Sequence, residues 1–272
     1  MKEELVQLIL ARLKADAAPL REAFGASTAK VGVRFCTIDN LLPADIAGRI
    51  AEAFPKLEQM RLMDSFRDRK YTSKKFEQVD PLMADITFAF QDPRIVAAVQ
   101  AITGIQHQMP DSSHHADGLS AMTRGHFLGP HIDNTHDGAR QNDRTLYLLY
   151  HVTPGCKGES GGHLELWNQP ATRKVPIESR FNRLARIKTT PISSHSVNPI
   201  QADGVRRCVS NHYFSPLSRT GTDYFNITAF SARPAQKPLR VVAWAAGKLR
   251  QARPRVVPGA LRRKDAYEAP PH

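Results

Sequence analysis

The 272-residue sequence predicts a mostly β domain with α-helices packed outside it, and two observations carry this prediction. The texture of the chain changes near residue 119, from segments with helical periodicity to short apolar runs divided by Gly, Pro, Asn and Ser. Helices followed by strands favour helices on the outside of a two-sheet barrel over an alternating parallel fold. The composition, 41% hydrophobic and 24% charged, is typical of a soluble globular protein.

The amino-terminal part is expected to contain three helices and one strand. The first helix repeats apolar residues near the 3.6-residue period and meets a stop at Gly25. The last has Asp92 at its start, Pro next and Gly104 at its end, which are strong boundary signals. The segment 55–80 is charged and aromatic and predicts no clear structure. The expected helices cover 2–24, 43–54 and 92–104, and the strand covers 31–38.

The remainder predicts about eight short strands, spaced as in a barrel made of two sheets. They are expected at 119–124, 125–132, 145–153, 162–167, 183–187, 192–196, 207–214 and 224–230.

The amino terminus lacks the apolar core of a secretory signal, and no stretch reaches the 18 apolar residues of a membrane span. Cys36, Cys156 and Cys208 are an odd number without paired spacing, which argues against a disulfide framework and a structural zinc site. A cytoplasmic protein is therefore expected.

The net charge of +12 is concentrated near the carboxy terminus, because residues 233–264 contain ten Lys or Arg and no Asp or Glu. One interpretation is a solvated basic tail. The others are contact with anionic lipid headgroups at the inner face of a membrane, with an acidic partner or, less favoured, with nucleic acid.

A short apolar run, Gly125 to Asp133, ends in two side chains of the kind that bind metal ions. Residues two apart in a strand point to the same face, so His131 and Asp133 can project into one pocket. A second His-x-Asp pair, His115 and Asp117, lies in a polar cluster typical of a loop. The strand context favours His131 and Asp133, and such a pair needs a third ligand.

His195 is the candidate for that ligand, since it lies on a later strand just before a loop. Two histidines and one carboxylate form the facial triad that suits non-haem Fe(II) and leaves positions open for a co-substrate and oxygen. The competing interpretation of His195 is an ordinary core histidine. Arg206 and Arg207 begin the next strand, where one of the two is expected to point into the barrel and meet an anion.

Together these motifs resemble the catalytic domain of the Fe(II)- and 2-oxoglutarate-dependent dioxygenases, in particular the prolyl 4-hydroxylase-like group. The resemblance covers about 120–231, and five elements stand in the family's order, which is more specific than any one of them. The elements are Gly125 to Asp133, the strand Arg144 to Tyr150, Gly161-Gly162-His-Leu-Glu-Leu, His195 followed by Pro199, and Gly204-Val-Arg-Arg.

The resemblance implies a double-stranded β-helix (jelly roll, cupin-like) core in which His131, Asp133 and His195 bind Fe(II). It also implies O2 as a reactant, 2-oxoglutarate as co-substrate and ascorbate as an optional addition. Three regions of one domain are expected: a helical and β support region over 1–118, the dioxygenase core over 119–231, and a basic extension over 232–272.

The resemblance further implies residues that contact 2-oxoglutarate. The family's basic residue, which pairs with the distal carboxylate, falls on Arg207 if the aromatic six positions later is matched to Tyr213. It falls on Arg206 if one instead counts from His195 or from Gly204. Arg207 is preferred, and Tyr150 takes the place of a family tyrosine that can contact the co-substrate.

The implied activity is hydroxylation of an unactivated C–H bond, with production of succinate and CO2. Family members that halogenate usually lack the carboxylate of Asp133, so hydroxylation or a related oxidation is favoured. The alternatives are a non-catalytic β-barrel that binds a small molecule or sugar, and a membrane-surface or nucleic-acid binding protein that uses 233–264. The basic tail favours an anionic or membrane-associated substrate, whose identity the sequence leaves open.

Overall fold

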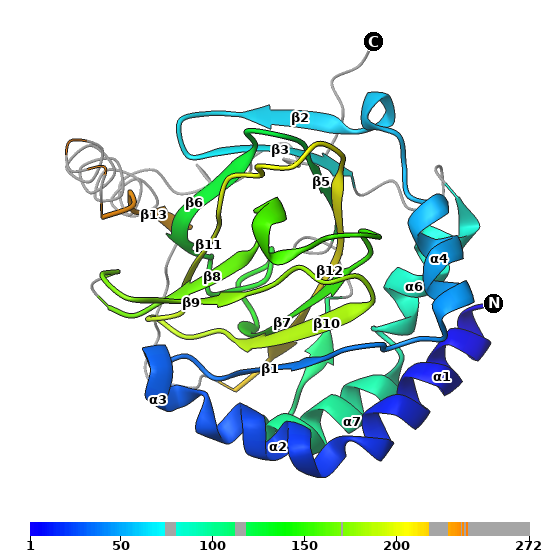
Figure 1. Ribbon diagram of the computed structural model, residues 1–272. Coiled ribbons are helices and arrows are strands. Elements are labelled where there is room, and N and C mark those ends of the chain that lie inside the picture. The colour runs from blue at the N-terminus through cyan, green and yellow to red at the C-terminus, as the bar shows by residue number, and fades with distance from the viewer. Residues whose placement is uncertain are drawn as a thin grey trace.

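The computed structural model describes residues 1–73, 80–111, 118–169, 171–217, 228–234, 236 and 238. A curled antiparallel sheet forms its centre, and helices cover one side of that sheet (Figure 1). The helices are α1 (Lys2–Ala15), α2 (Ala17–Ala26), α3 (Thr28–Val31), α4 (Ala44–Glu52), α6 (Pro81–Ala89) and α7 (Pro93–Thr103), with short 3-10 turns at Leu57–Gln59 and Gly158–Ser160.

Most of the strands lie after residue 117, and each of the eight predicted segments overlaps an observed strand. They are β1 (Phe35–Ile38), β2 (Arg61–Asp64), β3 (Asp68–Ser73), β4 (Met109–Pro110), β5 (Gly118–Met122), β6 (Phe127–Ile132), β7 (Asp143–His151), β8 (Leu164–Trp167), β9 (Lys174–Ile177), β10 (Arg183–Lys188), β11 (Ser194–Val197), β12 (Arg206–Ser215) and β13 (Ala229–Phe230).

The sheet runs in the order β1-β10-β7-β12-β5-β3-β6-β11-β8-β9, with antiparallel neighbours. It curls at β3, which pairs with β5 at one end and with β6 at the other, so that β6, β11, β8 and β9 form a second layer. The predicted mostly β fold with helices outside, a double-stranded β-helix, is confirmed.

The single helix expected over 2–24 is wrong, because the chain forms α1 and α2 with a break at Asp16. Pro19 has no N–H to donate to the carbonyl of Ala15, so a continuous helix cannot form there, whereas Pro is tolerated in a helix's first turn. At the break, the Oδ2 atom of Asp16 forms an ion pair with Nη1 of Arg12 at 2.5 Å. The break turns α2 along the edge of the sheet (Figure 1).

The helix predicted over 92–104 is confirmed as α7. The side chain of Asp92 accepts a hydrogen bond from the Arg94 N–H at 2.9 Å, and Gly104 ends the helix with φ 68°. The strand expected over 31–38 starts only at Phe35, because Val31 ends α3 and Gly32 follows with φ 76°.

The segment 55–80, for which the sequence predicted no structure, contains the β2–β3 hairpin. This hairpin lies tightly against β6: the Gly129 N–H donates to the Arg67 carbonyl at 2.7 Å, and a Cβ at Gly129 would lie 2.8 Å from that oxygen. Only a glycine allows this approach. The close approach joins β3 to the strand that carries His131.

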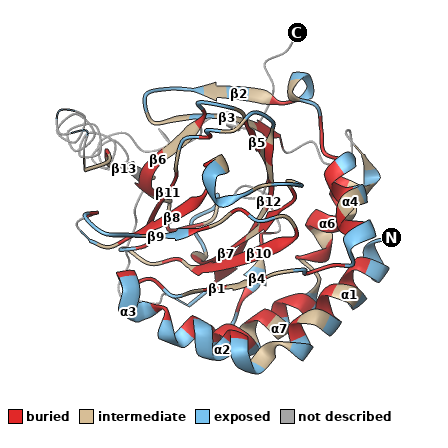
Figure 2. Cartoon of the chain, in the orientation of Figure 1, coloured by how far each residue is buried: buried red, intermediate tan, exposed pale blue. Residues whose placement is uncertain are grey.

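Apolar side chains bury both faces of the central strands. The outer face packs against the helices in one large core that includes Tyr150, Val209 and Tyr213 (Figure 2). The inner face holds two smaller clusters, one around Tyr147 and one around Met122. The candidate site lies between these two inner clusters.

The carboxy-terminal predictions lie largely outside the described residues. Of the strand expected at 224–230, Ala229 and Phe230 pair with β6, and most of the basic segment 233–264 lies outside the described residues. None of the helices in the described ranges has the length and apolarity needed to cross a bilayer.

Candidate metal centre

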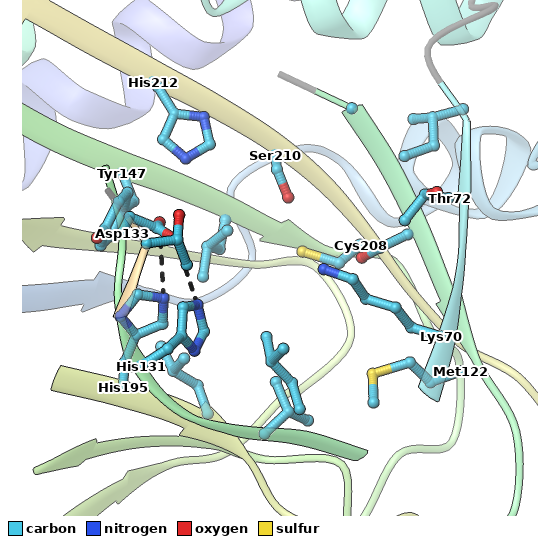
Figure 3. Close-up of a pocket in the computed structure, with 18 of the residues that line it drawn as sticks. Lys70, Thr72, Met122, His131, Asp133, Tyr147, His195, Cys208, Ser210 and His212 are labelled. Atoms are coloured by element: carbon cyan, nitrogen blue, oxygen red, sulfur yellow. Dashed lines mark ion pairs between the residues drawn. The ribbon is translucent and has the colours of Figure 1, made fainter. Parts of the chain in front are cut away.

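The three predicted metal ligands converge at one point inside the barrel. His131 lies near the end of β6, Asp133 directly follows that strand, and antiparallel pairing of β11 with β6 places His195 opposite His131. The Nε2 atoms of His131 and His195 lie 3.3 and 3.9 Å from the two carboxylate oxygens of Asp133 (Figure 3). One ligand atom from each residue lies within 4.8 Å of the others, in a group that is the only one of its kind among the described residues.

Each histidine is oriented by a backbone carbonyl. The Nδ1 atom of His131 lies 2.9 Å from the Gly129 oxygen, and that of His195 lies 3.2 Å from the Ser193 oxygen. A carbonyl accepts but cannot donate, so each Nδ1 carries the proton and each Nε2 presents its lone pair. Metal-binding histidines are commonly held in this way.

The electrostatics favour an ionised Asp133 and a neutral His195 at neutral pH. Burial raises the pKa of Asp133, but its hydrogen bond with His131 and the charges of His131, Arg144 and His195 hold that pKa well below its usual value. Burial, followed by the neighbouring His131, lowers the pKa of His195 to about 3. Asp133 and His195 are therefore in the deprotonated forms that bind a divalent cation.

The triad opens into a cavity of about 270 Å³ between the two layers of the sheet. Besides the triad, its wall carries the basic residues Lys70, Arg144 and Arg206. Asp133 is the only acidic residue in that wall within the described part of the chain. The wall also includes Thr72, Ser120, Met122, Tyr147, Leu149, Leu164, Val197, Cys208, Ser210 and His212.

The preference for Arg207 as the residue facing the cavity is wrong. Arg206 is buried and lines the cavity together with Cys208 and His212, whereas Arg207 does not. Alternate residues of a strand share a face, so Arg207 lies on the helix side of β12 with Val209. The Nε atom of Arg206 donates to the Gly162 carbonyl at 2.9 Å, and Nη1 contacts the Met122 sulfur at 3.9 Å.

Tyr150 also lies away from the cavity, which corrects its expected contact with the co-substrate. Its hydroxyl donates to Asn182 Oδ1 at 2.9 Å, and its ring packs beside Phe90 in the outer core. Tyr147 lines the cavity instead, with its ring 5.0 Å from that of His195. Burial, and then the charge of Asp133, hold the pKa of Tyr147 well above its usual value, so it is a neutral phenol.

The cavity residues that sequence reasoning missed include Lys70, Arg144, Tyr147 and His212. Tyr147 and His212 share a strand face with Leu149 and Arg206 respectively, and this alternation could have found them once the inner face was known. Arg144 donates to Asp133 Oδ2 at 3.1 Å. The sequence could not place Lys70 in the cavity, because no structure was predicted for the segment 55–80.

Two other ligand-like pairs make no second site in the described residues. His163 bonds the Gly158 carbonyl at 2.8 Å, and Glu165 binds Ser196, Lys174 and Arg233, so this pair is structural. His115 and Asp117 lie outside the described residues.

Comparisons with protein families and solved structures agree with the fold and with the grouping of the three residues. Residues 118–215 match the model of the 2OG-Fe(II) oxygenase superfamily, a segment that contains the triad and Arg206. No curated protein matches the chain.

Several solved structures share the fold at low identity. A prolyl hydroxylase from Trichoplax adhaerens, in complex with a hypoxia inducible factor peptide fragment, is 18% identical with a TM-score of 0.54, over 74% of this chain and 91% of that chain. A prolyl-4-hydroxylase from Pseudomonas putida is 15% identical with a TM-score of 0.52, over 73% and 100%. The non-heme alpha ketoglutarate dependent epimerase SnoN, from nogalamycin biosynthesis, is 15% identical with a TM-score of 0.51, over 80% and 87%.

Proposed function

We propose that this protein is an Fe(II)- and 2-oxoglutarate-dependent dioxygenase, because residues 118–215 match the model of the 2OG-Fe(II) oxygenase superfamily. We further propose that it hydroxylates an unactivated C–H bond of its substrate. The observation that carries the proposal is the buried triad of His131, Asp133 and His195, whose ligand atoms lie within 4.8 Å of one another at the wall of a cavity.

The donor set fits ferrous iron. Two imidazole nitrogens and one carboxylate on one side of a cavity are the ligands of non-haem Fe(II) oxygenases, which keep open positions for other reactants. Structural zinc is usually enclosed by four protein ligands, and the described residues contribute three here. The backbone carbonyls on both Nδ1 atoms fix the imidazoles for binding through Nε2.

The cavity also fits 2-oxoglutarate. The keto acid end would bind at the metal, and Arg206 would hold the distal carboxylate. Its bond to the Gly162 carbonyl fixes the guanidinium, and no carboxylate in the described ranges pairs with it. A fixed fork of N–H donors suits a carboxylate.

When bound, iron with 2-oxoglutarate and O2 supplies the oxidising chemistry, in which 2-oxoglutarate yields succinate and CO2 while one oxygen atom enters the substrate. The chain's part is to position and protect these reactants. Asp133 stays ionised and His195 stays neutral, and backbone carbonyls hold the Nδ1 atoms of His131 and His195. Apolar residues on both sides, such as Leu164 and Val197, limit the entry of water.

Turnover of 2-oxoglutarate tests the proposal. The full chain is incubated aerobically with Fe(II), ascorbate, 2-oxoglutarate and fractionated cell extract, and succinate is quantified together with oxygen incorporation from ¹⁸O2. We expect succinate from the wild type and none above background from His131→Ala. His107→Asn, at an exposed position outside the cavity, is the matched control and should behave as the wild type.

A non-catalytic barrel that binds a small molecule or sugar is the competing function. It predicts ligand binding without succinate or oxygen incorporation in any fraction, and equal behaviour of wild type and His131→Ala. That result would reject the dioxygenase. The SnoN structure shows that one fold can host a reaction other than hydroxylation, so the labelled product also decides the reaction type.

We also propose that residues 233–264 contact an anionic surface, which would favour an anionic or membrane-associated substrate. The support is the run of ten basic residues without an acidic one. Sedimentation with vesicles of neutral or anionic lipid tests this, using the full chain and a variant with Gln at the basic positions of 240–264. Equal binding of both proteins to both vesicles would reject it, and oligonucleotide binding is measured in parallel.

A further inference from the structure

We propose that Lys70 is a second cationic contact for the distal carboxylate of 2-oxoglutarate, beside Arg206. This inference rests on the proposed function. It assigns a role to a residue from the β2–β3 hairpin, which lies before the segment that matches the family model.

The register of three neighbouring strands places the two cations in one row. Arg206 on β12 pairs with Met122 on β5, and β5 pairs with β3 through Ala121 and Tyr71. Continuing that antiparallel register by one residue places Lys70 beside Met122. Neighbouring strands lie about 4.8 Å apart, so the Cα atoms of Lys70 and Arg206 are roughly 10 Å apart, with Met122 between them.

Both side chains belong to the inner face. Lys70 and Arg206 line the same cavity, as does Met122, whereas Tyr71 and Arg207, their neighbours in sequence, do not. Figure 3 shows the amino end of Lys70 pointing from β3 into the cavity, near Cys208 and on the side of the metal ligands. A side chain of this length can therefore share a ligand with Arg206.

Small side chains keep the space in front of the two cations open. The next row towards the metal ligands consists of Cys208, Ser120 and Thr72, which pair across the same three strands. All three line the cavity. A carboxylate in this space has Arg206 on one side, Lys70 on the other and the Ser120 hydroxyl as a further donor.

The cavity offers these cations no acidic partner among the described residues. Its one acid, Asp133, already bonds His131 and Arg144. A partly buried cation without a counter-charge is costly, and a carboxylate between Lys70 and Arg206 removes that cost. The arrangement favours 2-oxo acids with a second carboxylate over those that lack one.

Equilibrium binding tests the inference without relying on turnover. The full chain is loaded with Mn(II) under argon, and its affinity is measured for 2-oxoglutarate and for 2-oxobutanoate, which has the same chelating end but no distal carboxylate. The variants are Lys70→Met, which keeps the length of the stem, and Lys70→Arg, which keeps the charge. Arg69→Met is the matched control, since Arg69 is exposed on the same strand and does not line the cavity.

We expect Lys70→Met to bind 2-oxoglutarate 10- to 100-fold more weakly and 2-oxobutanoate as the wild type does. Lys70→Arg should recover most of the loss, and Arg69→Met should show none. Unchanged 2-oxoglutarate affinity in Lys70→Met would overturn the inference, as would an equal loss for both oxo acids. If the wild type with Mn(II) binds neither oxo acid, the proposed function is rejected. That result differs from the two outcomes that overturn only the role of Lys70.

Discussion

Arg144 donates from Nη1 to the Oδ2 atom of Asp133 at 3.1 Å, and its side chain is 5% exposed. The guanidinium therefore bonds one carboxylate oxygen, while the Nε2 atom of His131 lies 3.3 Å from the other. Burial raises the pKa of Asp133, but the hydrogen bond and charge of His131, followed by the charge of Arg144, hold it well below its usual value. The bond from Arg144 also fixes the orientation of the carboxylate. Arg144 is a positioning residue for the metal ligand.

Replacing Arg144 should therefore weaken metal binding. Arg144→Met is expected to reduce Fe(II) or Mn(II) affinity about 10- to 100-fold, because Asp133 loses the partner that orients it. Anaerobic calorimetric titration measures the change. Arg144→Lys retains the charge and should recover part of it, whereas wild-type affinity in Arg144→Met would show that Asp133 needs no such support.

Arg206 and Arg207 form a matched pair for the co-substrate site. Arg206→Met should raise the KM for 2-oxoglutarate about 10- to 100-fold, because a charge-assisted contact to the distal carboxylate is lost. Arg207→Met should leave this KM within about twofold, since Arg207 does not line the cavity. The reverse pattern in steady-state succinate assays would assign the carboxylate to Arg207.

Tyr150 should matter for stability rather than for co-substrate binding. Its hydroxyl bonds Asn182 in the core, so Tyr150→Phe is expected to lower the free energy of unfolding by about 1 kcal/mol. The KM for 2-oxoglutarate should stay unchanged. Urea unfolding and the succinate assay measure these two quantities, and Tyr147→Phe, at the cavity wall, is the contrasting variant expected to lower turnover. A raised KM in Tyr150→Phe would contradict the assignment.

Glu165 should make the stability depend on pH. Burial raises its pKa, but hydrogen bonds from Lys174, Ser196 and Arg233 outweigh this and hold the pKa below the usual 4.5. A carboxyl group with a lowered pKa in the folded state stabilises the fold above the unfolded-state pKa. That contribution is lost as the pH falls through the folded-state pKa.

Glu165→Gln is therefore expected to be less stable than the wild type at pH 7. The difference should shrink as the pH falls below about 4.5. Urea unfolding of both proteins between pH 7 and pH 3 measures the difference. A difference that stays constant over this range would show that the ion pairs of Glu165 contribute nothing.

The ligand triad and the capped helix α7 could be predicted because their signals are local or ordered along the chain. Asp92, Pro93 and Gly104 mark the bounds of α7 through bonds within a few residues. His131 and Asp133 share a strand face through their spacing, and the order of five motifs pointed to His195. The sequence analysis missed the break at Asp16, although Pro19, which prevents a continuous helix there, is visible in the sequence.

By itself, the sequence determined the mostly β architecture, the helices outside it and the three residues of the candidate metal triad. Only the tertiary structure decided that Arg206 and Tyr147, rather than Arg207 and Tyr150, face the cavity. Helices bury one face of β7 and β12, and the second sheet layer covers the other. Because both faces of these strands are buried, the alternation of side chains along each strand does not reveal which set of residues faces the cavity. The place of Lys70 depends on pairing between β3 and β5, a long-range contact that no local pattern encodes.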